Sequence, residues 1–394
     1  MPAARFGSAA RFGGVGALAL LAAAGLLTAC RGPGRTLEAP RPDQVFSQPQ
    51  PAGSRERYCA WYGDAREGTL YFGEAAFWSA SRAHGSPLGD RVEAGPRRIG
   101  RFDLGRRTWL PPLEAGPADS PTGVWDVLAH PNGRVYFTTW FDAMGWVDPE
   151  TGETGTLDAL GIALNEIALG PGAKLLVSRY GNGGAEPANG SVVLASEDGE
   201  LVAEYPLVPP EGYIVAPKTV GYDASRGEIW VTTDVFPKGP GPTRHDAYVL
   251  DQAGRELRRI ERPEVHFAAF RADGSGVIAE VDGARLVLRV RPASGEDARL
   301  VADESFPPVL DFVQDIHFAD DGRAVVTRWG GVVHVVASDG SLTTLRMPPV
   351  AEGGLYYSGV LANGRVCATH CEGIEVACAE LPSAAAAPAP AGLR

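Results

Sequence analysis

The stretch HPNGRVYFTTWFDAMGWVDPETGE (residues 130–153) contains two short runs of β-branched and aromatic residues, each bounded by turn-forming residues. Asn132–Gly133 precedes the first run and Thr151–Gly152 follows the second. Runs of this kind between Asn-Gly-type pairs predict short antiparallel strands joined by tight turns. Nearly the same arrangement returns at residues 361–380 as LANGRVCATHCEGIEVACAE. Its return far along the chain points to an internal repeat.

The unit occurs seven times. Its first runs read EGTLYFGE, NGRVYFTTW, GAKLLVSRY, RGEIWVTTD, GSGVIAEVD, DGRAVVTRW and NGRVCATHC, and the aligned turn glycines are Gly68, Gly133, Gly172, Gly227, Gly274, Gly322 and Gly364. An apolar segment precedes each run, a second strand follows it, and six units then continue into a further turn and strand. Four antiparallel strands recurring about every 45 residues are typical of a propeller blade. The sequence therefore predicts an all-β, seven-bladed propeller over residues 58–382, with six blades and an irregular first unit as the alternative.

The last unit lacks a fourth strand, because Ala379–Pro382 runs directly into an Ala/Pro-rich tail. We expect a strand from before Tyr58, around Val45–Phe46, to complete this blade. Such closure would leave only short, protected sheet edges.

The N-terminal residues 1–29 have the composition of an export signal, with Arg5 and Arg11 before a small, apolar segment. Leu27–Thr28–Ala29–Cys30 resembles a bacterial lipobox, which implies lipidation of Cys30 after removal of residues 1–29. Several acyl chains together give a stable membrane anchor. An ordinary export signal with a chance cysteine is the alternative. The next residue, Arg31, lacks the Asp of an inner-membrane retention signal, so we expect a lipid anchor in the bacterial envelope, with the outer membrane favoured.

Residues 30–57 are rich in proline and polar residues and predict an extended tether, and residues 383–394 predict a disordered tail. The net charge is −12 for the whole chain and becomes −14 when the two arginines of the signal are removed. No basic run with interleaved aromatic residues occurs. Nucleic acid is therefore not an expected partner, since phosphate neutralisation needs clustered Lys and Arg.

The phrases IGRFDL and IWVTTD, together with Pro121–Thr122–Gly123–Val124, resemble the NHL, SMP-30/gluconolactonase and streptogramin-lyase group of propellers. The resemblance covers most of residues 58–382. In the SMP-30 and lyase relatives it implies a divalent ion near the axis, which polarises a lactone carbonyl or accompanies a His-assisted elimination. Glu74, Glu166 and Asp234 lie in places loosely comparable to the metal ligands of the SMP-30 proteins.

Blade topology puts the short turns on one face and the variable loops on the other. Residues 75–98 and the segments GNGGAEPANG and VFPKGPGPTRHD are the long loops, and long loops on a rigid scaffold are where binding residues usually lie. The loop-rich face also receives the first residues of each inner strand and the last residues of the second strand. Seven carboxylates are expected there, and oxygen ligands of this kind suit Ca²⁺ or Mg²⁺: Glu74, Asp126, Asp142, Glu166, Asp234, Asp282 and Asp315. Asp at a strand end is also a common turn residue, so each could serve structure alone.

Lys218, His266 and His370 are expected on the same face, and the two histidines are candidate bases. Aromatic residues should rim it, and aromatic anchors with long loops are typical interface material. The candidate ligand-binding residues are Phe77, Trp78, Trp140, Phe141, Tyr180 and Lys218.

Four cysteines follow Cys30, and export would place them in a compartment that permits disulfides. If Glu372–Gly373 is a two-residue turn, Cys367 and Cys378 lie opposite each other and can be bridged. The remaining pair would then be Cys59–Cys371, across the ring seam. The alternative is a metal site formed by Cys367, Cys371 and His370.

Two functions remain open. The first is a lipid-anchored propeller that binds a protein, a glycan or a small molecule on its loop-rich face. The second is a divalent-metal-dependent lactonase, esterase or lyase that uses the acidic residues and His266 or His370. The chain lacks HExxH, GxSxG, SxxK and GxxxxGK[ST] motifs. The incomplete catalytic signature favours the binding protein.

Overall fold

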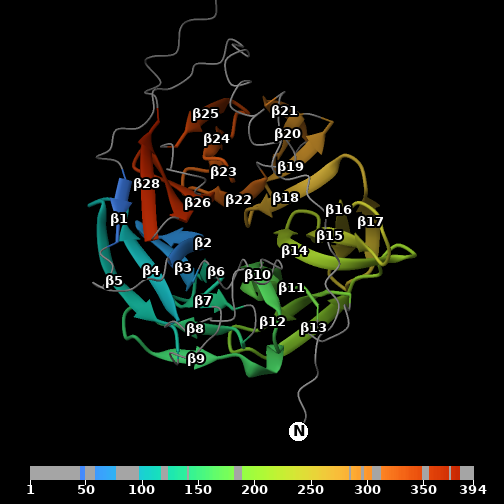
Figure 1. The fold of residues 1–394 in the computed structure, drawn as a ribbon, viewed down its shortest axis with the longest axis horizontal. Helices are drawn as coiled ribbons and strands as arrows, with labels where there is room; N and C mark the ends of the chain where they lie inside the picture. Colours follow the sequence, from blue (N-terminus) through green and yellow to red (C-terminus); the bar gives the residue numbers. More distant parts are fainter. Residues whose placement is uncertain are drawn as a thin grey trace, which may run out of the picture. The chain divides into compact units, whose positions relative to one another are not determined.

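In the computed structural model, seven four-stranded antiparallel sheets stand around a central axis (Figure 1). The structure describes residues 45–48, 58–76, 97–116, 123–139, 142–181, 189–283, 285–293, 297–303, 312–347, 355–371 and 374–381. The predicted seven-bladed, all-β propeller is confirmed, and the six-bladed alternative is excluded. Within these residues no helix is long and apolar enough to cross a membrane.

Each blade uses four strands that are consecutive in the chain, except the seventh. Blade one contains β2 (Tyr58–Arg66), β3 (Thr69–Ala76), β4 (Arg98–Asp103) and β5 (Thr108–Glu114). Blade two contains β6 (Asp126–Ala129), β7 (Val135–Thr138), β8 (Gly145–Val147) and β9 (Thr154–Thr156). Blade three contains β10 (Leu164–Leu169), β11 (Leu175–Arg179), β12 (Ser191–Ala195) and β13 (Leu201–Pro206). Blade four contains β14 (Tyr213–Asp223), β15 (Glu228–Pro237), β16 (Arg244–Asp251) and β17 (Glu256–Ile260).

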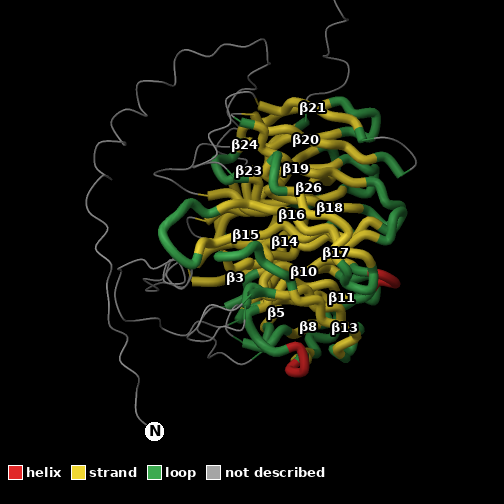
Figure 2. The backbone as a smooth tube through the Cα atoms, turned by 90° about the vertical axis from the view of Figure 1, so that its right-hand side faces the viewer, coloured by secondary structure: helices red, strands yellow, loops and turns green. Residues whose placement is uncertain are grey.

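The remaining blades follow the same order. Blade five contains β18 (Glu264–Phe270), β19 (Gly276–Asp282), β20 (Arg285–Arg291) and β21 (Ala298–Asp303). Blade six contains β22 (Val313–Phe318), β23 (Ala324–Arg328), β24 (Val332–Val336) and β25 (Leu342–Arg346). Blade seven contains β26 (Leu355–Ala362), β27 (Arg365–Cys371), β28 (Ile374–Glu380) and β1 (Val45–Ser47). Two short 3₁₀ turns, η2 (Asp158–Leu160) and η3 (Pro171–Ala173), are the helical elements in the described part of the chain, and they are red in Figure 2.

Blade seven closes the ring with a strand from the other end of the chain. β1 pairs antiparallel with β28, so that Val45 faces Ala377 and Phe46 faces Val376. Figure 1 shows the blue β1 beside the red β28. The ring of Phe46 packs 5.3 Å from that of Phe102 in blade one, which ties the seam to the neighbouring blade. The predicted closing strand is confirmed.

The apolar core lies between blades. One cluster joins Leu176 and Val192 of blade three to Val231 and Tyr248 of blade four, and other clusters join other neighbouring blades in the same way. The two faces of each sheet are thus covered by the sheets of the preceding and the following blade. This explains why the second and third strands are almost continuously apolar.

The first strand of each blade is the innermost, and its direction defines two faces of the ring. At the turn face, short turns join the first strand to the second; Gly133 and Gly364 take φ values of 101° and 74° there, which glycine adopts at little cost. At the loop face, the first strands begin and the second strands end. These two names are used below.

On several second strands, a side-chain hydroxyl group donates a hydrogen bond to a backbone carbonyl of the next blade. Ser178 of blade three donates to the Lys218 carbonyl at 3.0 Å, and Thr369 of blade seven donates to the Trp61 carbonyl at 2.9 Å. Thr138 of blade two donates to the Asn165 carbonyl in the same way. These residues occupy equivalent places in the repeated runs VYFTT, LLVSR and VCATH, so a repeated hydroxyl links successive blades.

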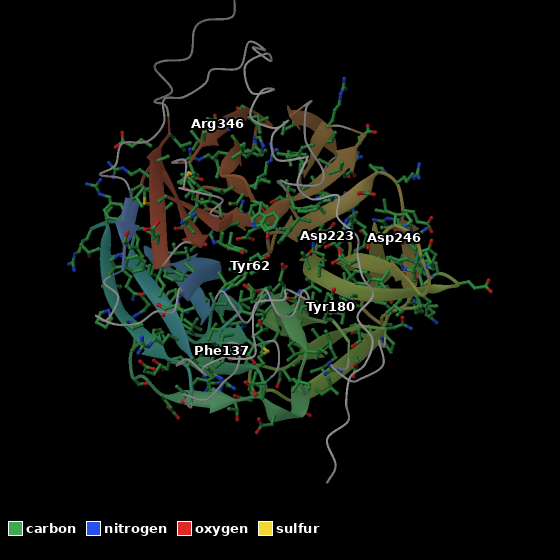
Figure 3. All side chains as sticks on the ribbon, in the orientation of Figure 1. Tyr62, Phe137, Tyr180, Asp223, Asp246 and Arg346 are labelled. Atoms are coloured by element: carbon green, nitrogen blue, oxygen red, sulfur yellow. A yellow bond between two sulfur atoms is a disulfide. The ribbon has the colours of Figure 1, made fainter. Side chains whose placement is uncertain are left out.

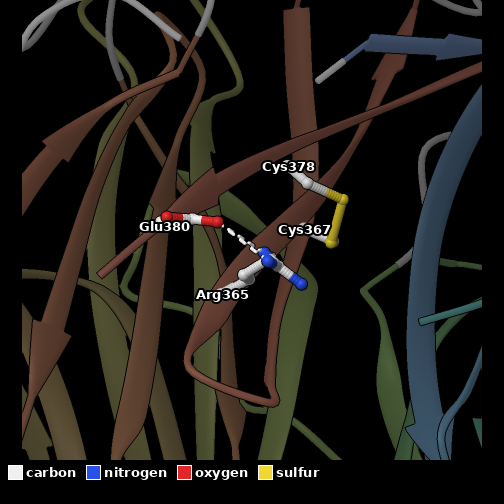
Figure 4. Close-up of a disulfide and its surroundings, with 4 residues drawn as sticks. All are labelled: Arg365, Cys367, Cys378 and Glu380. Carbon is white, nitrogen blue, oxygen red and sulfur yellow. Dashed lines mark hydrogen bonds and ion pairs between the residues drawn. A yellow bond between two sulfur atoms is a disulfide. The ribbon is translucent and has the colours of Figure 1, made fainter. Parts of the chain in front are cut away.

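The last blade contains the predicted disulfide. Cys367 on β27 and Cys378 on β28 face each other and are bonded, with their Cα atoms 4.0 Å apart (Figure 4). This pairing is confirmed, and it excludes Cys367 as a thiolate ligand in the alternative metal site. The side chains of Cys59 and Cys371 lie outside the described ones, so the second disulfide stays a prediction.

Candidate functional site

Polar side chains from blades three, four and five, and an aromatic ring from blade six, gather at the loop face. We call Tyr180, Lys218, Asp234, His245, His266 and Phe312 the loop-face cluster. They lie on or directly beside the end of β11, the middle of β14, the end of β15 and the starts of β16, β18 and β22. These positions share a face because inner strands begin, and second strands end, on the same side of the ring.

An aspartate–histidine pair forms the centre of this cluster. His245 Nδ1 lies 2.9 Å from the Asp234 Oδ1, and β15–β16 pairing places the two residues directly opposite each other. Burial acts to raise the pKa of Asp234, but Lys218, His245 and His266 together hold it below its usual value. Asp234 is therefore a carboxylate at neutral pH and fixes the orientation of the His245 ring.

His266 lies next to this pair and is buried. Its ring centroid is 5.4 Å from that of His245 and 5.5 Å from that of Phe312. Burial lowers the pKa of His266, while Glu264, 3.9 Å away, acts in the opposite direction. His266 is consequently neutral at pH 7, which is the state that a proton acceptor needs.

Lys218 and Tyr180 complete the cluster. The Lys218 ammonium lies 5.9 Å from the Phe312 ring centroid and interacts electrostatically with Asp234. Burial, and then the charge of Asp234, raise the pKa of Tyr180, so its phenol stays protonated. Figure 3 labels Tyr180 on the inner side of the ring.

Aromatic rings continue around the loop-face side of the axis. Trp125, just before β6, lies 4.5 Å from Trp61, which in turn lies 4.6 Å from Tyr357. Trp61 and Tyr357 are buried, whereas Trp125 is half-buried. Three blades thus contribute a group of closely spaced aromatic rings, of which Trp125 keeps part of its surface exposed.

Three of the seven predicted carboxylates come together deeper along the axis. Asp126, Glu166 and Asp315 from blades two, three and six line one cavity of about 730 Å³, and Asp64 of blade one joins them. Asp126 accepts the Ile167 N–H at 2.9 Å, and Asp64 accepts the Ala129 N–H at 2.9 Å, in each case from the next blade.

Burial dominates the acidity of these axial groups. It raises the pKa of Asp126 and of Glu166 well above their usual values, and the neighbouring carboxylates add to the effect. Burial also raises the pKa of Asp315 to about 6, although a hydrogen bond with Ser358 opposes it. Like charges in a shared site retain protons in this way.

The structure separates the other predicted carboxylates from this group. Asp142 forms an ion pair with Arg97 at 2.7 Å. Glu74 lies against Arg98 and Glu114, where burial raises its pKa to about 7, and Asp282 is exposed at the end of β19. Asp234 belongs to the loop-face cluster described above.

His370, the second candidate base, lies within blade seven. It is buried, its Nδ1 is 3.3 Å from Glu375, and its ring packs 4.9 Å from that of Tyr356. Glu375 also accepts a hydrogen bond from Ser47 of β1 at 2.8 Å. His370 therefore takes part in contacts that hold the closing strand.

Several residues named from the sequence lie outside the part of the chain that the structure describes. They are Phe77, Trp78, Trp140, Phe141, Cys30 and residues 1–29. Among the residues that the structure describes, no three His, Cys, Asp or Glu side chains are placed to hold a metal ion. Binding of Ca²⁺ or Mg²⁺ stays a prediction.

Sequence reasoning missed several residues of the two groups. Tyr62 lies within a bulge of β2, where the register shifts between Ala60 and Gly63, and Asp64 follows that bulge. His245 lies in the long segment VFPKGPGPTRHD that was singled out only for its length. Its partner position opposite Asp234 becomes visible only when the β15–β16 hairpin is built without a break in register.

Comparisons with known proteins find likeness in structure alone. No family model matches the chain, and no curated protein matches it. A structure of virginiamycin B lyase from Staphylococcus aureus, a catalytically inactive histidine-to-alanine variant with quinupristin, has a TM-score of 0.52 and 13% identity; 84% of this chain and 98% of that chain are covered. A selenomethionine form of the same lyase gives 0.57 and 12%, with 86% and 99% covered.

A third structure is the extracellular domain of a hybrid two-component system from B. thetaiotaomicron. It has a TM-score of 0.53 and 13% identity, and the match covers 87% of this chain and 41% of that chain. At this identity the likeness shows the fold alone. The predicted resemblance to streptogramin-lyase-type propellers is confirmed at that level.

Proposed function

We propose that this protein is a lipid-anchored extracytoplasmic propeller that binds a peptide or glycan ligand at the loop-face cluster. The observation that carries the proposal is the combination, at the loop face, of Lys218 and two histidines with closely spaced aromatic rings. Aromatic faces provide contact area, and a few converging polar groups fix the orientation of a ligand.

Export and anchoring rest on the N-terminal sequence and receive support from blade seven. The Cys367–Cys378 disulfide is what an oxidising compartment permits, whereas cytosolic proteins rarely keep such bonds. The anchoring experiment expresses the whole chain in a bacterial host with an alkyne-labelled fatty acid. Label and membrane association should be present in the natural chain and lost in Cys30→Ala. Equal membrane association of both chains would reject the anchor.

Ligand binding can be followed by the fluorescence of the loop-face tryptophans. Trp125→Phe should weaken binding of a selected peptide or glycan about tenfold, because stacking and hydrogen bonding of a ring contribute on the order of 1 kcal/mol or more. Trp146→Phe is the matched control. Trp146 is also half-buried, but it lies on β8, the third strand of blade two, and packs against Arg134. Equal losses of ligand affinity in both variants would reject the loop face as the binding site.

A second candidate is an enzyme that transfers protons, such as a lyase or a lactone hydrolase. The Asp234–His245 pair favours it, since a carboxylate that orients an imidazole is a common general-base arrangement. The neutral His266 beside the pair provides another proton acceptor. The likeness to a lyase whose inactive form lacks a histidine makes quinupristin one substrate to test, along with simple lactones.

Turnover should fall at least about a hundredfold in His266→Ala and in Asp234→Asn, which is the usual scale for losing a general base. Asp320→Asn on the turn face is the control and should keep full activity. Absence of turnover by the natural chain would leave binding as the function.

A further inference from the structure

A cavity runs along the axis on the other side of the ring from the loop-face cluster. Its volume is about 730 Å³, which is within the range of pockets that hold small molecules. It extends from the inner strands to the short turns of blades two to six, where its lining includes Pro131, Ala173 and Asp320. No residue of the loop-face cluster is among the described residues that line this cavity. The cavity is thus a second place at which the ring could hold a ligand.

The polar lining of the cavity is mostly acidic. Asp64, Asp126, Glu166 and Asp315 converge from four blades, and Asp320 stands near the turns. The basic groups in the described lining are Arg271 and His317. His317 already lies 2.8 Å from Asp64, and Arg271 lies 3.7 Å from Asp273. The described lining therefore contains more carboxyl groups than basic groups.

Glu166 differs from the other axial carboxyl groups in its partners. Asp126 accepts the N–H groups of Val127 and Ile167, and Asp64 is bonded by His317 and two N–H groups. The carboxyl group of Glu166 has no hydrogen-bond partner among the described residues. It lies deep in the protein, and what remains of its exposure is to the cavity.

A carboxyl group that is held partly away from water and has no donor is less stable in its charged form, and a ligand can supply that donor. Glu166 is half-buried, and the charge of Lys218 favours its carboxylate form by electrostatic attraction alone. The cavity lining also includes the apolar residues Ile167, Val220 and Phe267. The site consequently offers one acceptor without a donor among the described residues, further carboxyl groups and an apolar surface.

We propose that the axial cavity binds an organic ammonium ion whose charged nitrogen donates to Glu166 and whose apolar body lies along Ile167, Val220 and Phe267. Asp126 and Asp64 use their oxygens on backbone N–H groups, so we do not expect them to make the first contacts with the ligand. This inference is independent of the ligand proposed for the loop face.

The test is calorimetric titration of the full chain with hexane-1,6-diamine, and with hexane-1,6-diol as a neutral probe of the same length. The diamine should bind, and the diol should bind at least about tenfold more weakly, because a charge-assisted hydrogen bond contributes on the order of 1.5–3 kcal/mol. Glu166→Gln should weaken diamine binding about tenfold or more. Glu200→Gln, at an exposed turn of blade three outside the described cavity lining, is the matched control and should change it by no more than about twofold, since exposed charges contribute little.

Three results would overturn the inference: no heat with diamine at millimolar concentration, equal affinity for diamine and diol, or unchanged affinity in a folded Glu166→Gln variant. Stoichiometric Ca²⁺ binding that blocks the diamine and is lost in Glu166→Gln would replace the organic ion with a metal and also reject it. A folded variant is one whose circular dichroism and unfolding midpoint match those of the natural chain.

Discussion

His317 on blade six lies 2.8 Å from Asp64 on blade one, so that two blades on either side of blade seven are joined directly. Tyr62 of blade one makes a second such link, because its hydroxyl donates to Gln314 of blade six at 2.9 Å. Figure 3 labels Tyr62 toward the centre of the ring. Both links pass on the axial side of the blade that contains the ring seam.

The Asp64–His317 pair should make stability depend on pH. Burial acts against the charged ring, but Asp64 and then Asp315 raise the pKa of His317 above its usual value. A raised histidine pKa adds stability that is fully present below about pH 6.5, the unfolded value, and is lost as pH rises through the folded value. Urea unfolding at pH 6 and pH 9 should therefore show a drop that His317→Gln reduces.

His130→Gln is the control for this prediction, since the His130 ring pairs with the Ala173 carbonyl and not with a carboxylate. The same pH-dependent drop in the natural chain and in His317→Gln would contradict the assignment.

The inter-blade hydroxyl of Thr369 should contribute measurably to stability. Thr369→Val keeps the shape of the side chain but removes the bond to the Trp61 carbonyl and the acceptor of the Ser358 N–H. We expect a loss of about 1–3 kcal/mol in the free energy of unfolding, because buried polar groups lose their partners. Thr327→Val is a matched control on blade six: its buried hydroxyl has no hydrogen-bond partner in the described part of the chain. That variant should be neutral or slightly more stable, and equal losses in the two variants would disprove the role of the bond.

Reduction of the Cys367–Cys378 disulfide should destabilise the last blade. The two residues are 11 apart in sequence, and a short loop of this kind stabilises by roughly 2–4 kcal/mol through the unfolded chain. Cys367→Ser combined with Cys378→Ser should lower the unfolding midpoint, which scanning calorimetry measures. Peptide mapping without reductant should recover the Cys367–Cys378 pair in the natural chain, and the same map tests Cys59–Cys371. A free thiol at Cys367 would contradict the structure.

Phe46 should hold the closing strand in place. It is partly buried against the cluster of blades one and seven, so Phe46→Ala should cost on the order of 1–3 kcal/mol, less than for a fully buried ring. Hydrogen exchange should also quicken at the β28 amides that face β1. Leu257→Ala on the exposed outer strand β17 serves as the control, because Leu257 is 52% exposed. If exchange in β28 did not change, closure would not depend on Phe46.

The fold could be predicted from the sequence because each repeat contains a turn glycine followed by two strand-forming segments. Gly133 and Gly364 mark such turns, and the apolar second strands follow from burial between sheets. Even the closing strand could be predicted, since a blade that ends after its third strand must find a fourth. These features depend on local sequence and on a repeated architecture.

The site was harder to predict, because inner strands contain bulges. Register shifts occur between Leu164 and Ile167 and between Val313 and Asp315, among others, and each shift reverses which side chains face the axis. Simple alternation cannot foresee this reversal. It could not show that Asp234 lies apart from Glu166 and Asp315, or that Asp142 pairs with Arg97. Loop residues such as Trp78 lie outside the described chain, and their roles stay predictions.

The pairing of β1 with β28 has a consequence for biosynthesis. A ribosome releases the first strand long before it completes the last one, so the seventh sheet cannot assemble while translation continues. Until then β1 has no partner strand, and the unfinished seventh sheet has an uncovered edge that other chains could join. Premature termination anywhere upstream of β28 should therefore yield a product prone to aggregation, even with six sheets intact.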